Sequence, residues 1–288
     1  MEKRIVTLED IAKRSLSYSS IKEFRRSPEH FLHYLQYKKP PTAAQAFGSL
    51  VDKMILTPDN WEASFAVIPE KPAFLKDLVA VYGKDKGREM YDNGKLQYET
   101  FLKENAGKTL VTPQEIEEAK LITEKVWSNP AAAALLSRVT CTQNELRWTD
   151  KKTGLKMVGY LDGKGDNIIL ELKTTMNADP EMFAKDCIKY LYFLQAGIYC
   201  EGVKATEFEF PDFYYLAVEK TAPYGICVLK ADADYINYGK QEYRRLLDSF
   251  KYCLANKLFE KSYEYRSSNG GGYHHLLLPG WLAKDLNP

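Results

Sequence analysis

The feature that most restricts the fold is a short apolar strand that carries an acidic and a basic side chain. Residues 168–173 read Ile-Ile-Leu-Glu-Leu-Lys, a run of β-branched and apolar residues typical of a buried strand. Because successive side chains alternate between the two faces of a strand, Glu171 and Lys173 share one face and the leucines between them the other. A buried carboxylate is costly unless it is paired or bound to a metal. The strand therefore predicts a sheet core with a polar site on one face.

A second carboxylate ends the preceding β-pattern. Residues 156–162 read Lys-Met-Val-Gly-Tyr-Leu-Asp, and the glycine-rich residues 163–166 predict a tight turn before the next strand. An antiparallel hairpin would place Asp162 close to Glu171 and Lys173. For a Glu-x-Lys sequence alone, an ordinary ion pair on a solvated sheet face is the simpler interpretation. The second carboxylate favours a functional site instead.

Two carboxylates and a lysine suit the hydrolysis of a phosphodiester. Oxygen ligands from Asp162 and Glu171 match the preference of a hard cation such as Mg²⁺, and Mn²⁺ accepts the same ligands. A metal held there would polarise the scissile phosphate and lower the pKa of a bound water, while Lys173 would orient the water or offset negative charge. We therefore predict these three residues as the hydrolytic centre.

The helical pattern of residues 180–202 adds two polar side chains one turn apart. Gln195 and Tyr199 lie beside an apolar stripe that includes Phe183 and Leu194. An amphipathic helix with a polar shoulder is one interpretation of this pattern. The order of a Glu-x-Lys strand followed by a Gln-x-x-x-Tyr helix favours the other, in which both polar groups face the catalytic cleft.

The remaining patterns predict one α/β domain over residues 1–288 with a helical or irregular insertion at about 59–140. Further strands are expected at 144–150, 207–220 and 224–231, and helices at 17–38 with a break at Ser27-Pro28, 42–56, 113–128 and 235–257. Residues 59–107 show no clear periodicity, so we expect an irregular insertion or a flap there.

Composition excludes several classes of protein and leaves others open. The 40 Lys and Arg balance 39 Asp and Glu, so net charge gives no support to a nucleic-acid partner, although a neutral total can hide a basic groove. The five cysteines lie far apart and predict reduced, buried residues rather than disulfides or a zinc site. No apolar run reaches the roughly 20 residues of a membrane span, and no secretory signal is visible, so we expect a cytoplasmic protein without a membrane partner.

At this point the residues resemble the RecB-like branch of the PD-(D/E)XK nuclease superfamily. The pattern of that branch is Gly-x-x-Asp, Glu-x-Lys-[Thr/Ser] and Gln-x-x-x-Tyr, which matches residues 159–162, 171–174 and 195–199. Residues 17–31 are similar to its N-terminal motif and residues 48–56 to its first core helix. Leu-Pro-Gly-Trp-Leu-Ala at 278–283 is similar to a closing segment of phage recombination nucleases of the exonuclease VIII and lambda-exonuclease type.

This resemblance implies a restriction-endonuclease-like core, in which helices flank a central mixed sheet. It implies a 5′-to-3′ exonuclease that acts on double-stranded DNA ends, assembles as a homo-oligomeric ring and works with a single-strand annealing protein in phage or prophage recombination or repair. The backbone carbonyl of Leu172 would then be a metal ligand, Ser19 and Arg25 would hold the terminal phosphate, and Glu145 would be an accessory carboxylate. From the residues alone, Ser19 could equally cap a helix and Arg25 could be a surface charge.

Two positions depart from the pattern of the branch. Many members place a histidine that binds metal in Gly-x-x-x-His, whereas residues 48–52 of this chain end in Asp52. Aspartate can still bind Mg²⁺ through oxygen, so we include Asp52 among the candidate metal ligands. Members with an iron-sulfur cluster have Cys-Pro at the position of Ser27-Pro28, and we therefore expect no such cluster.

Two hypotheses follow for function. The first is a metal-dependent DNA exonuclease, which the set of motif residues favours. The second is a catalytically inactive module of the same fold that binds or assembles on DNA ends, which Asp52 and the neutral net charge favour.

Overall fold

A mixed five-stranded sheet forms the centre of the molecule. The computed structural model describes residues 4–37, 39–70, 73–207, 210–266 and 273–277. The strands are β3 (Val139–Thr149), β4 (Lys156–Gly165), β5 (Ile168–Thr175), β6 (Asp212–Glu219) and β7 (Ile226–Lys230), in that order across the sheet. β3, β4 and β5 are antiparallel neighbours, β5 and β6 are parallel, and β6 and β7 are antiparallel. The expected α/β class with a mixed sheet is confirmed.

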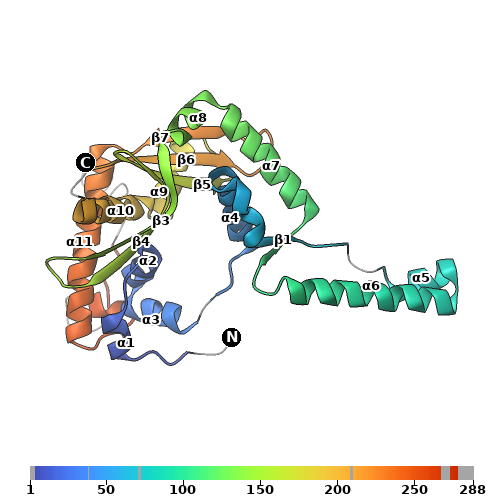
Figure 1. Cartoon of the computed structure of the whole chain (residues 1–288). Helices are drawn as coiled ribbons and strands as arrows, with labels where there is room; N and C mark the ends of the chain where they lie inside the picture. Colours follow the sequence, from blue (N-terminus) through green and yellow to red (C-terminus); the bar gives the residue numbers. More distant parts are fainter. Residues whose placement is uncertain (1–3, 38, 71–72, 208–209, 267–272, 278–288) are drawn as a thin grey trace.

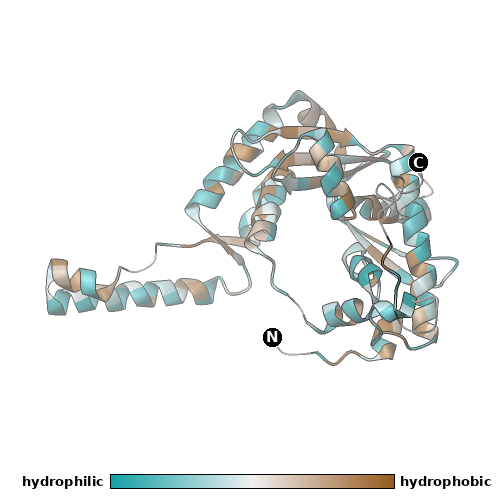
Figure 2. Ribbon diagram, turned by 180° about the vertical axis from the view of Figure 1, so that it is seen from behind, coloured by the Kyte–Doolittle hydropathy of each residue, from teal (hydrophilic) through white to brown (hydrophobic). Residues whose placement is uncertain are grey.

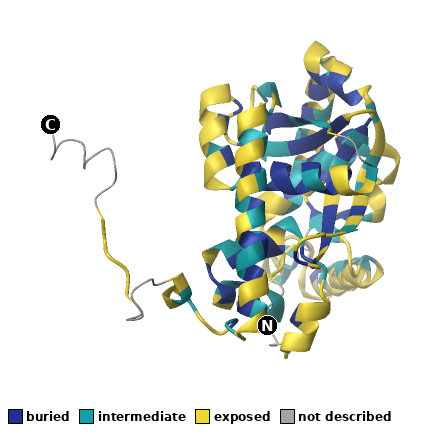
Figure 3. Cartoon of the chain, turned by 90° about the vertical axis from the view of Figure 1, so that its left-hand side faces the viewer, coloured by how far each residue is buried: buried dark blue, intermediate teal, exposed yellow. Residues whose placement is uncertain are grey.

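Helices cover both faces of this sheet, as the alternation in β5 requires (Figure 1). Leu170 and Leu172 belong to the core on the face of α4 (Ala43–Leu56), α7 (Pro113–Ser128) and α8 (Pro130–Leu136). Ile169 belongs to the core on the other face, which is covered by α2 (Tyr18–Arg26), α3 (Pro28–Gln36), α9 (Pro180–Lys189), α10 (Tyr192–Glu207) and α11 (Ala233–Ala255). The central strands are the most deeply buried elements (Figure 3).

Local signals fix several helix ends as expected. The Ser27 hydroxyl accepts from the His30 N–H, which ends α2 and starts α3 at Pro28. Thr112 and Glu115 form a capping box at the start of α7. These ends depend on residues three apart in the sequence, so the sequence alone predicts them.

Three sequence-based expectations need correction. Residues 180–202 do not form one helix, because Leu191 adopts a positive φ of 63° between α9 and α10. The predicted turn at 163–166 is shorter, since β4 continues to Gly165 and the chain turns at Asp166 and Asn167. Cys141 is exposed rather than buried.

The segment 59–107 was expected to be irregular, but much of it is helical. After the 3₁₀ turn Pro58–Ala63, strand β1 (Phe65–Val67) pairs in parallel with β2 (Thr109–Val111). Between these strands, α5 (Leu75–Tyr82) and α6 (Lys84–Glu104) form a hairpin that extends away from the sheet, with hydrophilic and hydrophobic residues interspersed (Figures 1 and 2). A Cβ at Gly87 would lie 2.7 Å from the Val79 nitrogen, so glycine permits this close helix contact.

The shorter elements are α1 (Leu8–Lys13) and the 3₁₀ turn Tyr263–Arg266. No helix among the described residues combines the length and the apolar character needed to cross a membrane. The closing segment at 278–283 that the sequence singled out lies outside the described residues.

Candidate active site

The strands β4 and β5 diverge at the predicted hydrolytic centre. Their pairing stops at Gly163 and Leu170, although both strands continue beyond this point. In the gap, the Leu172 N–H donates to Asp162 Oδ2 at 3.0 Å and the Asp162 N–H donates to Glu171 Oε1 at 3.5 Å. Side-chain carboxylates thus take the place of the carbonyl acceptors of a regular ladder, which brings both acids to one opening in the sheet.

Glu171 is the centre of a buried hydrogen-bond network. The residue is 1% exposed, and its Oε2 accepts from Lys173 Nζ at 2.8 Å and from Gln195 Nε2 at 2.7 Å. Gln195 Nε2 also lies 3.3 Å from the Tyr199 hydroxyl. The structure therefore brings the two motif residues of α10 to the acid and the lysine of β5.

The glycine of the Gly-x-x-Asp motif has a packing role in this network. A Cβ at Gly159 would lie 3.2 Å from the ring of Tyr199, which is tighter than an ordinary contact. Glycine on β4 thus allows α10 to approach the sheet closely enough for Gln195 to reach Glu171.

Helix α4 contributes Asp52 to the same site. A Cβ at Gly48 would lie 2.9 Å from Thr174 Oγ1, so glycine permits the close approach of α4 to β5. One turn later, Asp52 Oδ2 accepts from Gln143 Nε2 at 2.8 Å. Gln143 has a positive φ of 51°, an uncommon conformation for a residue with a side chain, and it lies on β3 between Thr142 and Asn144, which pair with Gly163 and Leu161 of β4.

The site concentrates negative charge around one cation. Burial raises the pKa of Glu171 to about 8 and the pKa of Asp52 to about 7, and repulsion from Asp162 adds to both shifts. Burial also raises the pKa of Asp162. Burial alone would lower the pKa of Lys173, but the carboxylates of Glu171 and Asp162 hold it well above its usual value. Lys173 is therefore an ammonium ion at neutral pH.

The chemistry of these donors fits a divalent cation. Among the residues that the structure describes, no three side chains of His, Cys, Asp or Glu converge closely enough to hold a metal as they stand. However, Asp52 Oδ1 is buried and has no hydrogen-bond partner within the described chain. A cation near Asp162 and Glu171 would partner this oxygen and offset the repulsion that raises the carboxylate pKa values. The donor set of oxygen atoms matches Mg²⁺ or Mn²⁺.

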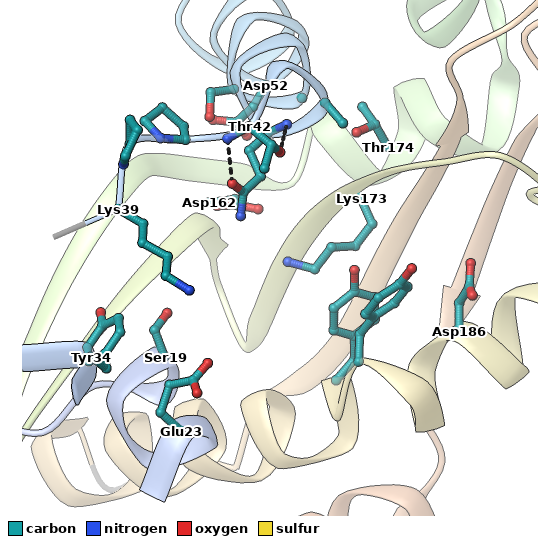
Figure 4. Close-up of a pocket in the computed structure, with 18 of the residues that line it drawn as sticks. Ser19, Glu23, Tyr34, Lys39, Thr42, Asp52, Asp162, Lys173, Thr174 and Asp186 are labelled. Atoms are coloured by element: carbon teal, nitrogen blue, oxygen red, sulfur yellow. Dashed lines mark hydrogen bonds between the residues drawn. The ribbon is translucent and has the colours of Figure 1, made fainter. Parts of the chain in front are cut away.

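The site opens into a groove of about 1550 Å³. Asp52, Asp162 and Lys173 line the groove, Ser19 lies across from the two aspartates, and the Lys39 ammonium points toward Ser19 (Figure 4). Arginine and lysine outnumber the acids in the lining, with Arg4, Arg14, Arg26, Lys39, Lys173 and Lys220 against Glu23, Asp52, Asp162 and Asp186. The nearly neutral chain thus has a basic groove.

The residues expected to contact DNA are placed differently from one another. Ser19 lines the groove, and so does Leu172, whose backbone carbonyl is a candidate metal ligand. Arg25 does not line it, because its Nε donates to Glu242 on α11 at 2.7 Å, whereas its neighbour Arg26 does. Glu145 lies on the exposed side of β3 and pairs with Arg147, away from the groove.

Sequence patterns alone did not identify three groups at the groove. Gln143 escaped notice because its role depends on an uncommon backbone conformation. Tyr190 and Tyr192 also line the groove, at the unexpected break between α9 and α10. The 20 tyrosines of the sequence could supply stacking surfaces for bases, but their number does not show which of them line the groove.

The sequence matches one known family over most of its length. That family is described as a PDDEXK-like domain of unknown function (DUF3799), and the match covers residues 17–264. Comparison with curated proteins found no match.

One solved structure supports the same fold. A protein of Eubacterium rectale described as a candidate exonuclease has a TM-score of 0.57 at 14% sequence identity, over 99% of this chain and 98% of that one. LHK-Exo in complex with dAMP matches with a TM-score of 0.28 at 13% identity, over 74% of this chain and 94% of that chain. SSO0001 has a TM-score of 0.29 at 14% identity, over 78% of this chain and 92% of that chain. The last two TM-scores are too low to show a common fold. By its family match and its fold, the chain belongs to the PDDEXK-like family DUF3799 within the PD-(D/E)XK nuclease superfamily.

Proposed function

We propose that this protein is a nuclease that uses a divalent metal ion to hydrolyse DNA from its ends. One observation carries the proposal: the carboxylates of Asp162 and Glu171 meet Lys173 where β4 and β5 diverge, at the side of a basic groove. The name of the Eubacterium rectale protein, which has the same fold, also favours an exonuclease.

Asp162, Glu171, the Leu172 carbonyl and Asp52 are the proposed ligands of Mg²⁺ or Mn²⁺. The bound ion would supply a Lewis acid for the scissile phosphate and would lower the pKa of a water molecule. Asp52 would turn from Gln143 to use its unpartnered Oδ1. No ligand is an imidazole or a thiolate, which favours a hard cation over zinc.

Lys173 supplies positive charge in this proposal. Its ammonium stays protonated at neutral pH, so it donates hydrogen bonds and offsets the negative charge that develops on the phosphate. Glu171 fixes the position of the ammonium, and Gln195 in turn fixes Glu171. The N-terminal side of the groove, with Ser19 and Lys39, faces the phosphates of the bound strand.

The finer features of the proposal depend on resemblance to phage recombination nucleases. These features are the 5′-to-3′ direction, double-stranded ends, a homo-oligomeric ring, a single-strand annealing partner and a cytoplasmic role in recombination or repair. One domain over residues 1–288 would perform this reaction.

Hydrolysis of linear duplex DNA with Mg²⁺ tests the proposal, with closed circular DNA of the same sequence as the companion substrate. We expect loss of the linear DNA and survival of the circle, and a label at each end in turn reports the direction. Asp162→Asn should abolish hydrolysis, and Asp248→Asn, which changes an exposed carboxylate on α11, should not. Intact linear DNA under all metal conditions would contradict the proposal.

An inactive module that binds DNA ends is the second candidate. The Gln143 hydrogen bond that engages Asp52, and the lack of three converging metal-binding side chains among the described residues, favour it. It predicts salt-dependent DNA binding that Asp162→Asn leaves unchanged, together with no hydrolysis by the unmodified protein.

A further inference from the structure

The junction between α9 and α10 combines a strained backbone with two tyrosines at the groove. Leu191 has a φ of 63°, a left-handed conformation that is costly for a residue with a branched side chain. The residues on either side, Tyr190 and Tyr192, both line the groove. Strain of this kind persists only where the surrounding structure enforces it, and it is common at binding sites.

Two buried or partly buried tyrosines hold the junction in this conformation. The Tyr18 hydroxyl donates to the carbonyl of Tyr190 at 2.7 Å, and the Tyr215 hydroxyl donates to the carbonyl of Tyr192 at 2.9 Å. These bonds come from α2 and from β6, so elements distant in sequence fix both sides of Leu191.

The strained residue determines where the two rings point. In a continuous helix, residues two apart would project roughly 200° from each other around the axis. Here the ring centres of Tyr190 and Tyr192 lie 5.7 Å apart with planes tilted by 33°. The break in the helix therefore brings both rings together at the groove lining, where the Tyr192 ring also stacks on the core tyrosine Tyr215.

Cations surround this pair and connect it to the hydrolytic centre. Lys173 Nζ lies 5.1 Å from the centre of the Tyr192 ring. The ammonium groups of Lys22 and Lys189 lie 5.8 and 5.0 Å from the centre of the Tyr190 ring. Aromatic faces beside cations are the combination with which proteins hold unpaired nucleotides, since bases stack on the rings while lysines attract phosphates.

We propose that Tyr190 and Tyr192 form a stacking platform for the base of an unpaired nucleotide next to the scissile phosphate. This inference rests on the proposed function and adds that the strand in the groove is single-stranded at the cut. Tyr190 is 38% exposed and therefore accessible to a ligand in the groove, whereas the core tyrosine Tyr215 is 2% exposed. Stacking on an aromatic face tolerates every base, so we expect no strong sequence preference.

The test is the binding of a short single-stranded DNA with a fluorescent label, measured by anisotropy in EDTA so that hydrolysis does not occur. We expect Tyr190→Leu to bind about tenfold more weakly, within the range for loss of one stacked base. Tyr190→Phe should bind as the unmodified protein does, because it keeps the aromatic face. Tyr252→Leu is the matched control, since Tyr252 is an exposed tyrosine on α11 outside the groove lining.

A strand whose terminal nucleotides lack bases provides a second measurement that needs no variant. The unmodified protein should bind it about tenfold more weakly than the intact strand, and Tyr190→Leu should make this difference smaller. Equal affinity of the unmodified protein for the two strands would overturn the inference. Thermal unfolding of each variant shows whether it is folded.

The two proposals fail in different ways. If the intact and abasic strands bind equally while Asp162→Asn still abolishes hydrolysis, the platform is wrong and the nuclease assignment stands. If neither strand binds and no DNA is hydrolysed with any metal, the nuclease assignment fails and the platform with it.

Discussion

Carboxylates are buried at the turn between β3 and β4 and also in the groove, and the two sites differ in how the negative charge is compensated. At the turn between β3 and β4, Asp150 is 6% exposed and accepts hydrogen bonds from Arg244 at 2.6 and 2.9 Å and from the Thr153 hydroxyl at 2.6 Å. Burial alone would raise the pKa of Asp150, but these donors outweigh it and lower the pKa to about 2. Every oxygen of this acid has a partner.

In the groove, burial outweighs the contacts that would lower the pKa of the carboxylates. Asp52, Asp162 and Glu171 share one lysine, and the pKa of each is raised by burial and, for Asp52 and Glu171, by repulsion from Asp162. Asp150 thus has the surroundings of a stabilising ion pair, whereas the groove acids have surroundings that favour binding of a further cation. The comparison predicts that substitutions at the first site change stability and that substitutions at the second change activity.

The largest expected effect is on hydrolysis. Glu171→Gln removes a charge from the proposed metal site and should reduce the rate by roughly a thousandfold or more, as loss of one strong electrostatic contact does in other enzymes. The initial rate of digestion of linear duplex DNA measures it. The Asp150→Asn variant should digest DNA at nearly the unmodified rate once its stability is taken into account. An equal loss of hydrolysis rate in both variants would contradict the distinction between a catalytic and a stabilising site.

The next effect is on stability at the other site. Arg244→Leu leaves Asp150 buried without its main partner and should lower the free energy of unfolding by about 2 kcal/mol, less than for a fully buried pair because the Arg244 side chain is 34% exposed. Urea denaturation measures the change. Lys152→Leu, which removes an exposed ion pair with Asp248 in the same region, should cost about 0.5 kcal/mol or less.

The same pair predicts a dependence on pH. Because the pKa of Asp150 is lower in the folded than in the unfolded protein, its stabilisation is complete above its unfolded value of about 4 and is lost as the pH falls toward 2. The stability difference between the unmodified protein and Asp150→Asn should therefore shrink by about 1 kcal/mol between pH 5 and about 3. A difference that grows on acidification would show that the assigned direction of the shift is wrong.

The smallest effect on stability should come from Asp52. This acid has one donor, Gln143, and one unpartnered oxygen, so Asp52→Asn removes repulsion and should change the free energy of unfolding by less than about 1 kcal/mol, toward greater stability. The same variant should bind Mn²⁺ more weakly by calorimetry. Strong destabilisation together with unchanged Mn²⁺ affinity would show that Asp52, like Asp150, has a structural role.

Part of the site followed from the sequence because its signals are local. The alternation in β5 gave the common face of Glu171 and Lys173, and the short turn after β4 gave the proximity of Asp162. The spacing of Gln195 and Tyr199 gave their shared helix face. The sequence could not distinguish Arg25 from Arg26, because both lie on α2 and only the contact of Arg25 with Glu242 separates it from Arg26, which lines the groove.

Other features needed contacts between distant segments. No local pattern shows that α5 and α6 form a hairpin, since only Gly87 among their residues is buried and α6 is rich in charged and polar residues. The divergence of β4 from β5 and the positive φ of Gln143 also have no sequence period.

The sequence alone specifies the chemical groups of the site and the strand or helix face on which each one lies. Strand alternation, helix periodicity and capping act over a few residues, so the printed chain already specified the acids, the lysine and most helix ends. Which of these groups contact one another depends on tertiary packing. Asp52 reaches the groove because Gly48 lets α4 approach β5, and Tyr190 and Tyr192 turn toward it because hydroxyls from α2 and β6 hold their carbonyls. Such contacts join segments far apart in the chain, where no local preference can fix them.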